Sequence, residues 1–414
     1  MNEKYYNFMK NSLEKLVAIP SVKAAPLPGK PFGEEIDRAL NETLALCASM
    51  GFTTRSLDGY CGVAEIGEGE DFGILVHLDV VPVGGGWLSD PWTLTERDGK
   101  LFGRGTCDDK GPALAALYAV KAILDEGLAP KKKIKFIFGC DEESGWACMK
   151  HYEKVEKMPA MGISPDADFP VINCEKGILH LKLTFDKPEG VEVISGGQRP
   201  NMVADSCTAR LTAGTELETK GVAAHGSTPE KGENAIVKML GAIAREHDGW
   251  TRFYEMFNSH DGEGVGVKLS DKESGNLTMN LGVVASTSDK VSFTIDIRFP
   301  ITYKKDDIIA RVQEKTEALS IEQLEYQAPL YVAEDNELVT ALMDAYVHVT
   351  GDKKARPITI GGGTYARALP LGVAFGTTFP GEPSVAHMPN EYLSVDSAKK
   401  SLEIYYKALK KLCF

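Results

Sequence analysis

Several short apolar runs in this chain lead directly into a histidine or an acid, and this layout constrains the fold more than any other feature. The run Ile74–Val76 leads into His77, and the run Lys133–Gly139 leads into three acids. Short apolar runs are typical of strands covered on both faces, as in parallel sheets. An open α/β sheet binds ligands at the carboxyl ends of its strands. The motifs with this layout are His77-Leu78-Asp79, Asp108-Asp109-Lys110-Gly111, Asp141-Glu142-Glu143, Asp166 and His387, with His225 as an outlier.

The apolar runs alternate with helical patterns. Apolar residues recur at helical spacing from Ile36 to Cys47 and again from Leu114 to Leu124. Alternation of strands and helices predicts an α/β fold, with a doubly wound, mostly parallel sheet and helices on both faces. The alternation of strands and helices returns after residue 331. There we expect a helix over Leu338–Val349, a strand over Val373–Thr378 and a terminal helix over Asn390–Leu412.

The middle of the chain has a different pattern. Apolar and polar residues alternate over Leu179–Phe185, Leu277–Val284 and Val291–Phe299, which is typical of strands with one wet face. We therefore expect an antiparallel α+β domain at 185–330, inserted as a lid into a discontinuous catalytic domain formed by 1–184 and 331–414. Two rounds of strands followed by a helix suggest an internal duplication that relates Asn201–Ala204 to Asn280–Val283.

Composition and charge narrow the function classes. The chain has 414 residues, and its net charge of −13 argues against nucleic acid, which requires a basic face, but is compatible with cation binding. No apolar stretch approaches the ~20 residues of a membrane span, and the N-terminus lacks the apolar segment of a signal peptide. The eight cysteines are scattered without a C-x-x-C pair, which is typical of reduced thiols. We expect a cytoplasmic protein that binds neither nucleic acid nor membranes.

Each motif also has a purely structural interpretation. Residues i and i+2 of an extended chain share a side, so Asp79 could orient the ring of His77. The pair could equally be a turn histidine beside a solvated acid. Asp108 and Asp109 precede a helix, so one of them could cap it while the other points into the sheet crevice.

The acids at 141–143 also have both a functional and a structural interpretation. Adjacent extended residues point in opposite directions, so Glu142 and Glu143 should not serve one metal in the same way. One could be a ligand and the other a base that holds the attacking water. The alternative is a solvated acidic loop. Asp166 and His387, each taken alone, are more typical of ordinary loop residues.

The summed charge of the motifs favours two metal ions. The three carboxylates of Asp108, Glu143 and Asp166 carry more negative charge than one divalent ion neutralises. With two ions bridged by a carboxylate and a hydroxide, the positive and negative charges are nearly equal. A bridging Asp with one His and one carboxylate per ion leaves open positions for water and substrate. Nitrogen and oxygen ligands of this kind accept zinc, manganese or cobalt.

Five segments from His77 onward resemble, in order, the metal-site motifs of a known family. They are HLDVVPVGGGW, GRGTCDDKGP, CDEESG, SPDADFP and AHMPNEYL. The family is the di-metal exopeptidase family (peptidase family M20) that contains carboxypeptidase G, succinyl-diaminopimelate desuccinylase, acetylornithine deacetylase and aminoacylase, with a phosphorylase/hydrolase-like catalytic domain. Its dipeptidase branch, with dipeptidase V-like and Xaa-His dipeptidases, is the most similar, through PDADFPVINCEKG, GGQRPNMVAD and GGGTYAR.

The resemblance implies a set of metal ligands. Asp108 would bridge two divalent ions per chain, with zinc expected and manganese or cobalt as alternatives. His77 and Asp166 would complete one position, and Glu143 and His387 the other.

The resemblance also implies roles around these ligands. Glu142 would be the general base, Asp79 would support His77, and a cis peptide would precede Asp109.

Further implied residues lie in the insert and after it. His225 would stabilise the oxyanion, although without the resemblance it is a loop histidine before a helix. Asn201 and Arg298 would reach the substrate, with Arg298 near its C-terminal carboxylate, although such an arginine is usually solvated. Gly362 and Gly363 belong to the loop that approaches the substrate backbone in this branch.

We therefore expect a metallopeptidase that hydrolyses dipeptides, with a lid that covers both ends of the substrate. A duplicated insert in this branch mimics a dimer within one chain, which favours a monomer over a homodimer. One alternative is an N-acyl-amino-acid amidohydrolase with the same metal core. Others are a non-catalytic metal- or peptide-binding protein and a structural α/β protein with solvated acidic loops.

Overall fold

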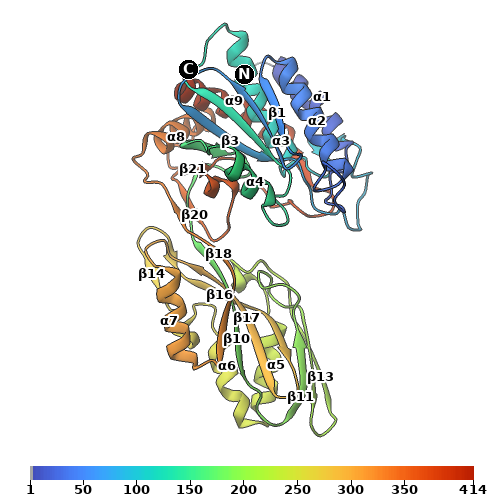
Figure 1. Cartoon of the computed structure of the whole chain (residues 1–414), viewed down its shortest axis with the longest axis vertical. Coiled ribbons are helices and arrows are strands. Elements are labelled where there is room, and N and C mark those ends of the chain that lie inside the picture. The colour runs from blue at the N-terminus through green and yellow to red at the C-terminus, as the bar shows by residue number, and fades with distance from the viewer. Residues whose placement is uncertain (1–2) are drawn as a thin grey trace. The chain divides into compact units, whose positions relative to one another are not determined.

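In the computed structural model, which describes residues 3–414, the apolar runs form neighbouring strands of one sheet (Figure 1). The chain divides into two units. The first contains the chain up to Asn173 together with Val332–Ile358 and Thr364–Phe414. The second contains Cys174–Tyr331 and Thr359–Gly363. All the expected metal ligands therefore belong to the first unit.

The main sheet has parallel strands at its centre and antiparallel strands at its edges, in the order β1-β2-β6-β3-β7-β21-β9-β19, with β20 paired to β9. The central pairings β6–β3, β3–β7 and β7–β21 are parallel, and those of β1, β2, β9 and β19 are antiparallel. The sheet is thus mixed, and the expected parallel arrangement holds for its centre. The strands are β1 (Thr53–Leu57), β2 (Cys61–Ile66), β3 (Asp71–His77), β6 (Lys133–Gly139), β7 (Met161–Ser164), β9 (Ile172–Glu175), β19 (Leu330–Tyr331), β20 (Ile358–Ile360) and β21 (Leu371–Ala374).

The parallel centre brings the carboxyl ends of its strands to one edge. His77, the last residue of β3, pairs with Gly139, the last residue of β6. Ile74 of β3 pairs with Ile163 of β7, so β7 ends at the same edge. The acids that follow these strands in the sequence are therefore delivered to one place.

Helices cover both faces of this sheet. Adjacent strand residues point to opposite faces. On β2, a Cβ at Gly62 would lie 2.6 Å from Leu40 of α2, whereas Cys61 Sγ lies 3.8 Å from the Cys148 carbonyl oxygen of α4. The helices of this unit are α1 (Glu3–Val17), α2 (Glu34–Ser49), α3 (Lys110–Asp125), α4 (Ala147–Val155), α8 (Glu337–Thr350), α9 (Val395–Cys413) and the short 3₁₀ helix η4 (Tyr365–Ala368).

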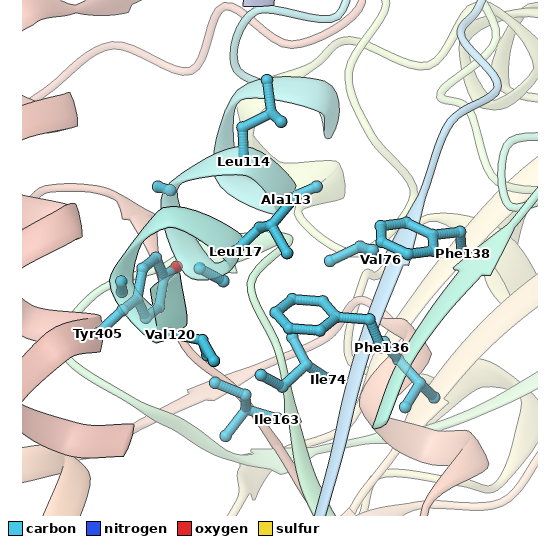
Figure 2. Packing of buried hydrophobic residues seen from close by; sticks show 14 of the residues in the cluster. Ile74, Val76, Ala113, Leu114, Leu117, Val120, Phe136, Phe138, Ile163 and Tyr405 are labelled. Atoms are coloured by element: carbon cyan, nitrogen blue, oxygen red, sulfur yellow. The ribbon is translucent and has the colours of Figure 1, made fainter. Parts of the chain in front are cut away.

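The core between β3, β6 and α3 consists mainly of apolar side chains. Figure 2 shows Ile74, Val76, Phe136 and Phe138 of the two strands facing Leu117 and its neighbours on α3. All of these side chains are buried. Burial of this kind stabilises the sheet by roughly 1.5–3 kcal/mol per large side chain and fixes the strand ends that carry the polar motifs.

Two expected elements differ from those observed. The strand expected over Val373–Thr378 is split at Phe375 and Gly376 into β21 and β22 (Thr377–Thr378), which pairs with β8 (Ala167–Asp168). The terminal helix begins at Val395 instead of Asn390, because Ser394 caps it and the preceding residues form β23. β23 (Tyr392–Ser394) pairs with β5 (Lys100–Phe102), which pairs with β4 (Thr95–Arg97).

Two features expected from composition also have structural counterparts. Over residues 3–414, no helix combines the length and the apolar character needed to cross a membrane. All eight cysteines carry free thiols.

The second unit is built on a seven-stranded antiparallel sheet in the order β13-β12-β11-β16-β17-β10-β18. The apolar side of its strands packs on helices around Trp250 and Phe293. The strands are β10 (Gly177–Asp186), β11 (Val191–Gly196), β12 (Ser206–Leu211), β13 (Glu216–Lys220), β16 (Thr278–Ser286), β17 (Lys290–Phe299) and β18 (Ser320–Gln327), with a small hairpin of β14 (Ser270–Asp271) and β15 (Gly275–Asn276). The helices are α5 (Ala235–Ala244), α6 (Thr251–Phe257) and α7 (Lys305–Thr316), with 3₁₀ turns η1 (Pro229–Lys231), η2 (Asp248–Trp250) and η3 (Glu263–Val265).

The structure locates the boundary between the units earlier than 184/185. That position lies inside β10, whose residues from Gly177 onward pair with β17, so the second unit begins at Cys174. The two segments expected to be related by duplication have different structures, since Asn201–Ala204 contains only an isolated bridge at Met202, whereas Asn280–Val283 lies within β16. The duplication and the lid role of this unit stay predictions.

Gly139→Ala should destabilise the first unit. A Cβ at Gly139 would lie 2.3 Å from the hydroxyl of Tyr365, whose buried ring cannot retreat because it packs between His77 and Trp146. We expect the free energy of unfolding to fall by about 1–3 kcal/mol, as measured by urea denaturation. The matched control is Gly85→Ala, where a Cβ meets no atom within 4 Å. Equal stability of the two variants would contradict this account of the packing.

Candidate active site

The expected ligands form one polar cluster at the carboxyl edge of the parallel strands. Nε2 of His77 lies 2.9 Å from Oδ1 of Asp108 and 3.4 Å from Oδ2 of Asp166. Nε2 of His387 lies 2.9 Å from Oδ2 of Asp108 and 2.9 Å from Oε1 of Glu143. The structure therefore brings together five residues that are up to 310 positions apart in the sequence, from His77 to His387.

Asp108 occupies the middle of the cluster. One of its carboxylate oxygens faces His77 and the other faces His387. Two overlapping groups have ligand atoms within 4.8 Å of one another, namely His77 with Glu142 and Asp166, and His77 with Asp108 and Glu143. Glu142 thus lies close enough to belong to a ligand group, and distance alone does not separate its proposed role as a base from that of a ligand.

The turn before α3 presents Asp108 to the cluster. The peptide between Asp108 and Asp109 is cis, as the family resemblance implies. Asp109 occupies the N-cap position of α3, but its Oδ2 accepts the backbone N–H of His77 at 3.0 Å. The idea that one of these acids caps the helix through its side chain is therefore wrong for Asp109, which fixes the end of β3 instead.

Asp79 holds the cluster through both its backbone and its side chain. Nδ1 of His77 lies 2.9 Å from the carbonyl oxygen of Asp79, closer than the 3.6 Å to its carboxylate. Because a carbonyl oxygen only accepts, Nδ1 carries a proton, which leaves Nε2, the nitrogen that faces the acids, as the one that would bind a metal. The Asp79 carboxylate accepts the N–H groups of Glu142 and Glu143, each at 3.1 Å.

The cluster has a strongly negative potential. Burial raises the pKa of Glu142, and the charges of Asp166 and Glu143 add to this effect. Hydrogen bonds to Asp108 and Glu143 raise the pKa of His387 to about 10. For His77, burial lowers the pKa, but hydrogen bonds to acids including Asp108 and Asp166 outweigh it and raise the pKa well above its usual range. The site therefore favours positive charge at its centre.

These residues fit a divalent-metal centre. The donors are carboxylate oxygens and imidazole nitrogens, the set that zinc, manganese and cobalt accept. The negative potential that raises the histidine pKa values would equally attract a cation. No cysteine thiol contributes to either candidate ligand group found over residues 3–414.

The residues expected to bind substrate form a second cluster, within the second unit. The carbonyl oxygen of Gly361 accepts Nη1 of Arg298 at 2.8 Å. A Cβ at Gly361 would lie 2.9 Å from the Cβ of Ser227, whose hydroxyl lies 2.7 Å from Nδ1 of His225. The N–H of Gly226 donates to the carbonyl oxygen of Asn201 at 2.8 Å.

This second cluster links all the expected substrate-binding residues. The loop that contains Gly362 and Gly363 begins at Gly361, beside the His225 turn. The functional roles of Asn201, His225 and Arg298 stay predictions.

Arg298 is not the solvated arginine that its strand pattern suggests. It is only 3% exposed, and its Nε and Nη2 donate to the two oxygens of Asp296 at 2.7 and 2.8 Å. Nε2 of His180 lies 3.4 Å from Asp296, and its Nδ1 lies 3.0 Å from Glu325. The sequence does signal this pairing, because residues two apart on a strand share a face.

Arg104 and Glu391 form a buried ion pair that was not among the residues expected at the site. Nη1 of Arg104 donates to Oε2 of Glu391 at 2.6 Å, and both side chains are about 1% exposed. Both residues lie inside motifs that carry the family resemblance, GRGTCDDKGP and AHMPNEYL. The sequence contains one signal of this pair, which is the charged Arg104 between Gly103 and Gly105.

Comparisons with known proteins show which family this chain resembles. Residues 73–411 match the family model described as Peptidase family M20/M25/M40. "Putative dipeptidase YtjP" of Bacillus subtilis (strain 168) is 38% identical over 93% of this chain and 92% of its own length. "Putative dipeptidase SSP1012" of Staphylococcus saprophyticus is 35% identical over 99% and 98%. The solved structure of an aminoacylhistidine dipeptidase from Vibrio alginolyticus has a TM-score of 0.63 at 13% identity and covers 97% of this chain and 96% of that one.

The matched span and the geometry lead to one family. The five clustered residues that are expected to bind metal, and Glu142, fall within residues 73–411. The relatives cover nearly the whole chain at more than 30% identity, and the structural likeness shows the same fold. The chain therefore belongs to peptidase family M20.

Proposed function

We propose that this protein is a dipeptidase that uses two divalent metal ions and Glu142 as general base. The observation that carries the proposal is the position of Asp108, whose two carboxylate oxygens each lie 2.9 Å from the Nε2 of a different histidine. A carboxylate placed in this way could be the ligand that two metal ions share in a two-metal hydrolase.

The ligands would divide around Asp108. His77 and Asp166 would hold one ion, and Glu143 and His387 the other, with zinc as the expected metal. When bound, the ions would polarise the scissile carbonyl and make a water molecule a better nucleophile near neutral pH.

Glu142 is suited to move the proton. Burial raises its pKa, and a carboxylate with a raised pKa is a stronger proton acceptor at neutral pH. Its backbone is fixed because its N–H donates to Asp79. Glu142 would take a proton from the attacking water and later give it to the leaving amine.

His225 is suited to stabilise the oxyanion. The backbone N–H of Ser227 donates to Nδ1 of His225 at 3.2 Å, so Nδ1 carries a lone pair. The proton of the neutral ring then lies on Nε2, which makes Nε2–H a donor for a developing negative charge.

Several residues of the second cluster would bind the substrate backbone. Asn201, Gly362 and Gly363 lie beside the His225 turn or in the loop that packs against it. Arg298 would act near the C-terminal carboxylate of the dipeptide. Its pairing with Asp296 holds the guanidinium in one orientation, which reduces the entropy that binding costs.

Glu142→Gln should retain metal and lose turnover. The amide keeps the shape of the side chain but cannot take a proton, so kcat should fall about 10²–10⁴-fold. Metal analysis after dialysis should still give two ions per chain, as in the native protein. Glu153→Gln, on the exposed side of α4, is the matched control and should be fully active. A Glu142→Gln enzyme with normal kcat would remove Glu142 from its proposed role.

His225→Ala should lower kcat about 10²–10³-fold, the usual loss for one oxyanion donor. Its metal content and thermal stability should stay unchanged, since His225 is exposed and belongs to the second unit. His260→Ala, at another exposed histidine of the same unit, serves as control. Unchanged kcat for His225→Ala would refute the oxyanion assignment.

A substrate panel should separate a dipeptidase from an amidohydrolase. We expect the metal-reconstituted enzyme to hydrolyse free dipeptides and to lose activity when either the amino or the carboxyl end is blocked. Initial rates would be measured for free dipeptides, N-acetylated and C-amidated dipeptides, and N-acetyl amino acids. Faster hydrolysis of N-acetyl amino acids would favour an N-acyl-amino-acid amidohydrolase.

A further inference from the structure

Arg104 and Glu391 form a buried ion pair that lies outside the proposed metal-ligand set. Both side chains are about 1% exposed, and the bond between them is 2.6 Å long. Taking two charges out of water is costly, and apolar residues of similar size often give equal stability. A gain in stability therefore does not explain why the chain contains this buried ion pair.

Arg104 joins two segments that flank the ligands. Its Nη2 approaches the carbonyl oxygens of Pro82 and Val83 at 3.3 and 3.4 Å, in the segment that follows His77 and Asp79. The same nitrogen lies 3.4 Å from the carbonyl oxygen of His387. A planar guanidinium with several donors can hold such a group of acceptors, whereas an ammonium group cannot match their geometry.

Glu391 extends the link to Asp108. Its Oε1 accepts the backbone N–H of Cys107, the residue before Asp108, at 3.0 Å. Its carbonyl oxygen accepts the N–H of Gly103 at 3.1 Å. The ion pair thus connects the turn that presents Asp108 with the segment that presents His387.

His387 depends on such a link more than the other ligands do. Its side chain is 52% exposed, and its φ of 65° lies in the left-handed region. Within the described chain, residues 379–391 contain neither a helix nor a strand. His77, by contrast, is the last residue of a buried strand.

We propose that Arg104 and Glu391 form a positioning pair that sets the place of His387 relative to Asp108, and thereby the metal affinity of the position formed by Asp108, Glu143 and His387. The inference rests on the proposed two-metal function. Residues that orient metal ligands without binding the metal typically change affinity 10–100-fold. The other position shares Asp108, but its own ligands His77 and Asp166 form no hydrogen bond with Arg104 in the described structure, so its affinity should change little.

The test is a calorimetric Zn²⁺ titration of the full chain after removal of metal with a chelator. Wild type should bind two ions. Arg104→Lys keeps the charge but loses the planar fork, and should bind one ion as wild type does and the other 10–100-fold more weakly. His387→Ala removes the ligand itself and identifies which binding step belongs to that position. The absorption spectrum of bound Co²⁺ provides a second readout, and its changes should be confined to the same step.

The matched control is Arg55→Lys. Arg55 also pairs with a glutamate, since it donates two N–H groups to Glu156 at 3.0 and 2.9 Å, but it lies on the edge strand β1. This variant should bind both Zn²⁺ ions with wild-type affinity even if its stability falls.

The outcomes separate the two proposals. Wild type that binds fewer than two Zn²⁺ ions would refute the two-metal function itself. Wild type with two ions, together with an Arg104→Lys variant that loses affinity at neither position or equally at both, would overturn the positioning role. If Arg104→Lys does not fold, Glu391→Gln carries the same expectation, and full affinity at both positions in that variant overturns the proposal.

Discussion

The contacts of the Asp108 carboxylate with two histidines are the interaction on which the rest of the site depends. One oxygen faces His77 and the other faces His387, each at 2.9 Å. His77 comes from the end of a buried strand, whereas His387 comes from a segment without regular structure among the described residues. The first unit must therefore place a turn, a strand end and a loop within hydrogen-bond distance of one another. Most polar contacts at the carboxyl edge of the parallel strands hold these three segments in place.

The parallel centre of the sheet brings most of these segments together. Because β3, β6 and β7 run in the same direction, their carboxyl ends deliver His77, the 142–143 acids and Asp166 to one edge. Asp79 then fixes two of these ends together, since its backbone orients His77 and its carboxylate holds the N–H groups of Glu142 and Glu143. As a dipeptidase-like hydrolase of family M20, the chain thus builds its candidate metal centre from strand ends that are already rigid.

The sequence was sufficient to predict these strand ends, because short apolar runs and the polar residues after them are local signals. It was not sufficient for contacts that depend on how distant segments meet. Asp109 could be read as a helix cap, and only the fold shows that it accepts the N–H of His77. Arg104 and Glu391 are 287 residues apart in the sequence. In each case the missing information was the partner of a charge, which no local pattern encodes.

Burial and crowding of the acids would contribute differently to metal binding and to base strength. Crowded carboxylates raise the pKa values of the histidines they contact, so the cluster favours cations. Burial and these same neighbouring charges raise the pKa of Glu142. A carboxyl group that binds no metal in such a field holds a proton more tightly than one in water, which is the property required of the proposed base. When ions bind, they would neutralise the charges of the ligand acids, so burial, the first cause of the raised pKa of Glu142, is the part that would remain to support the base.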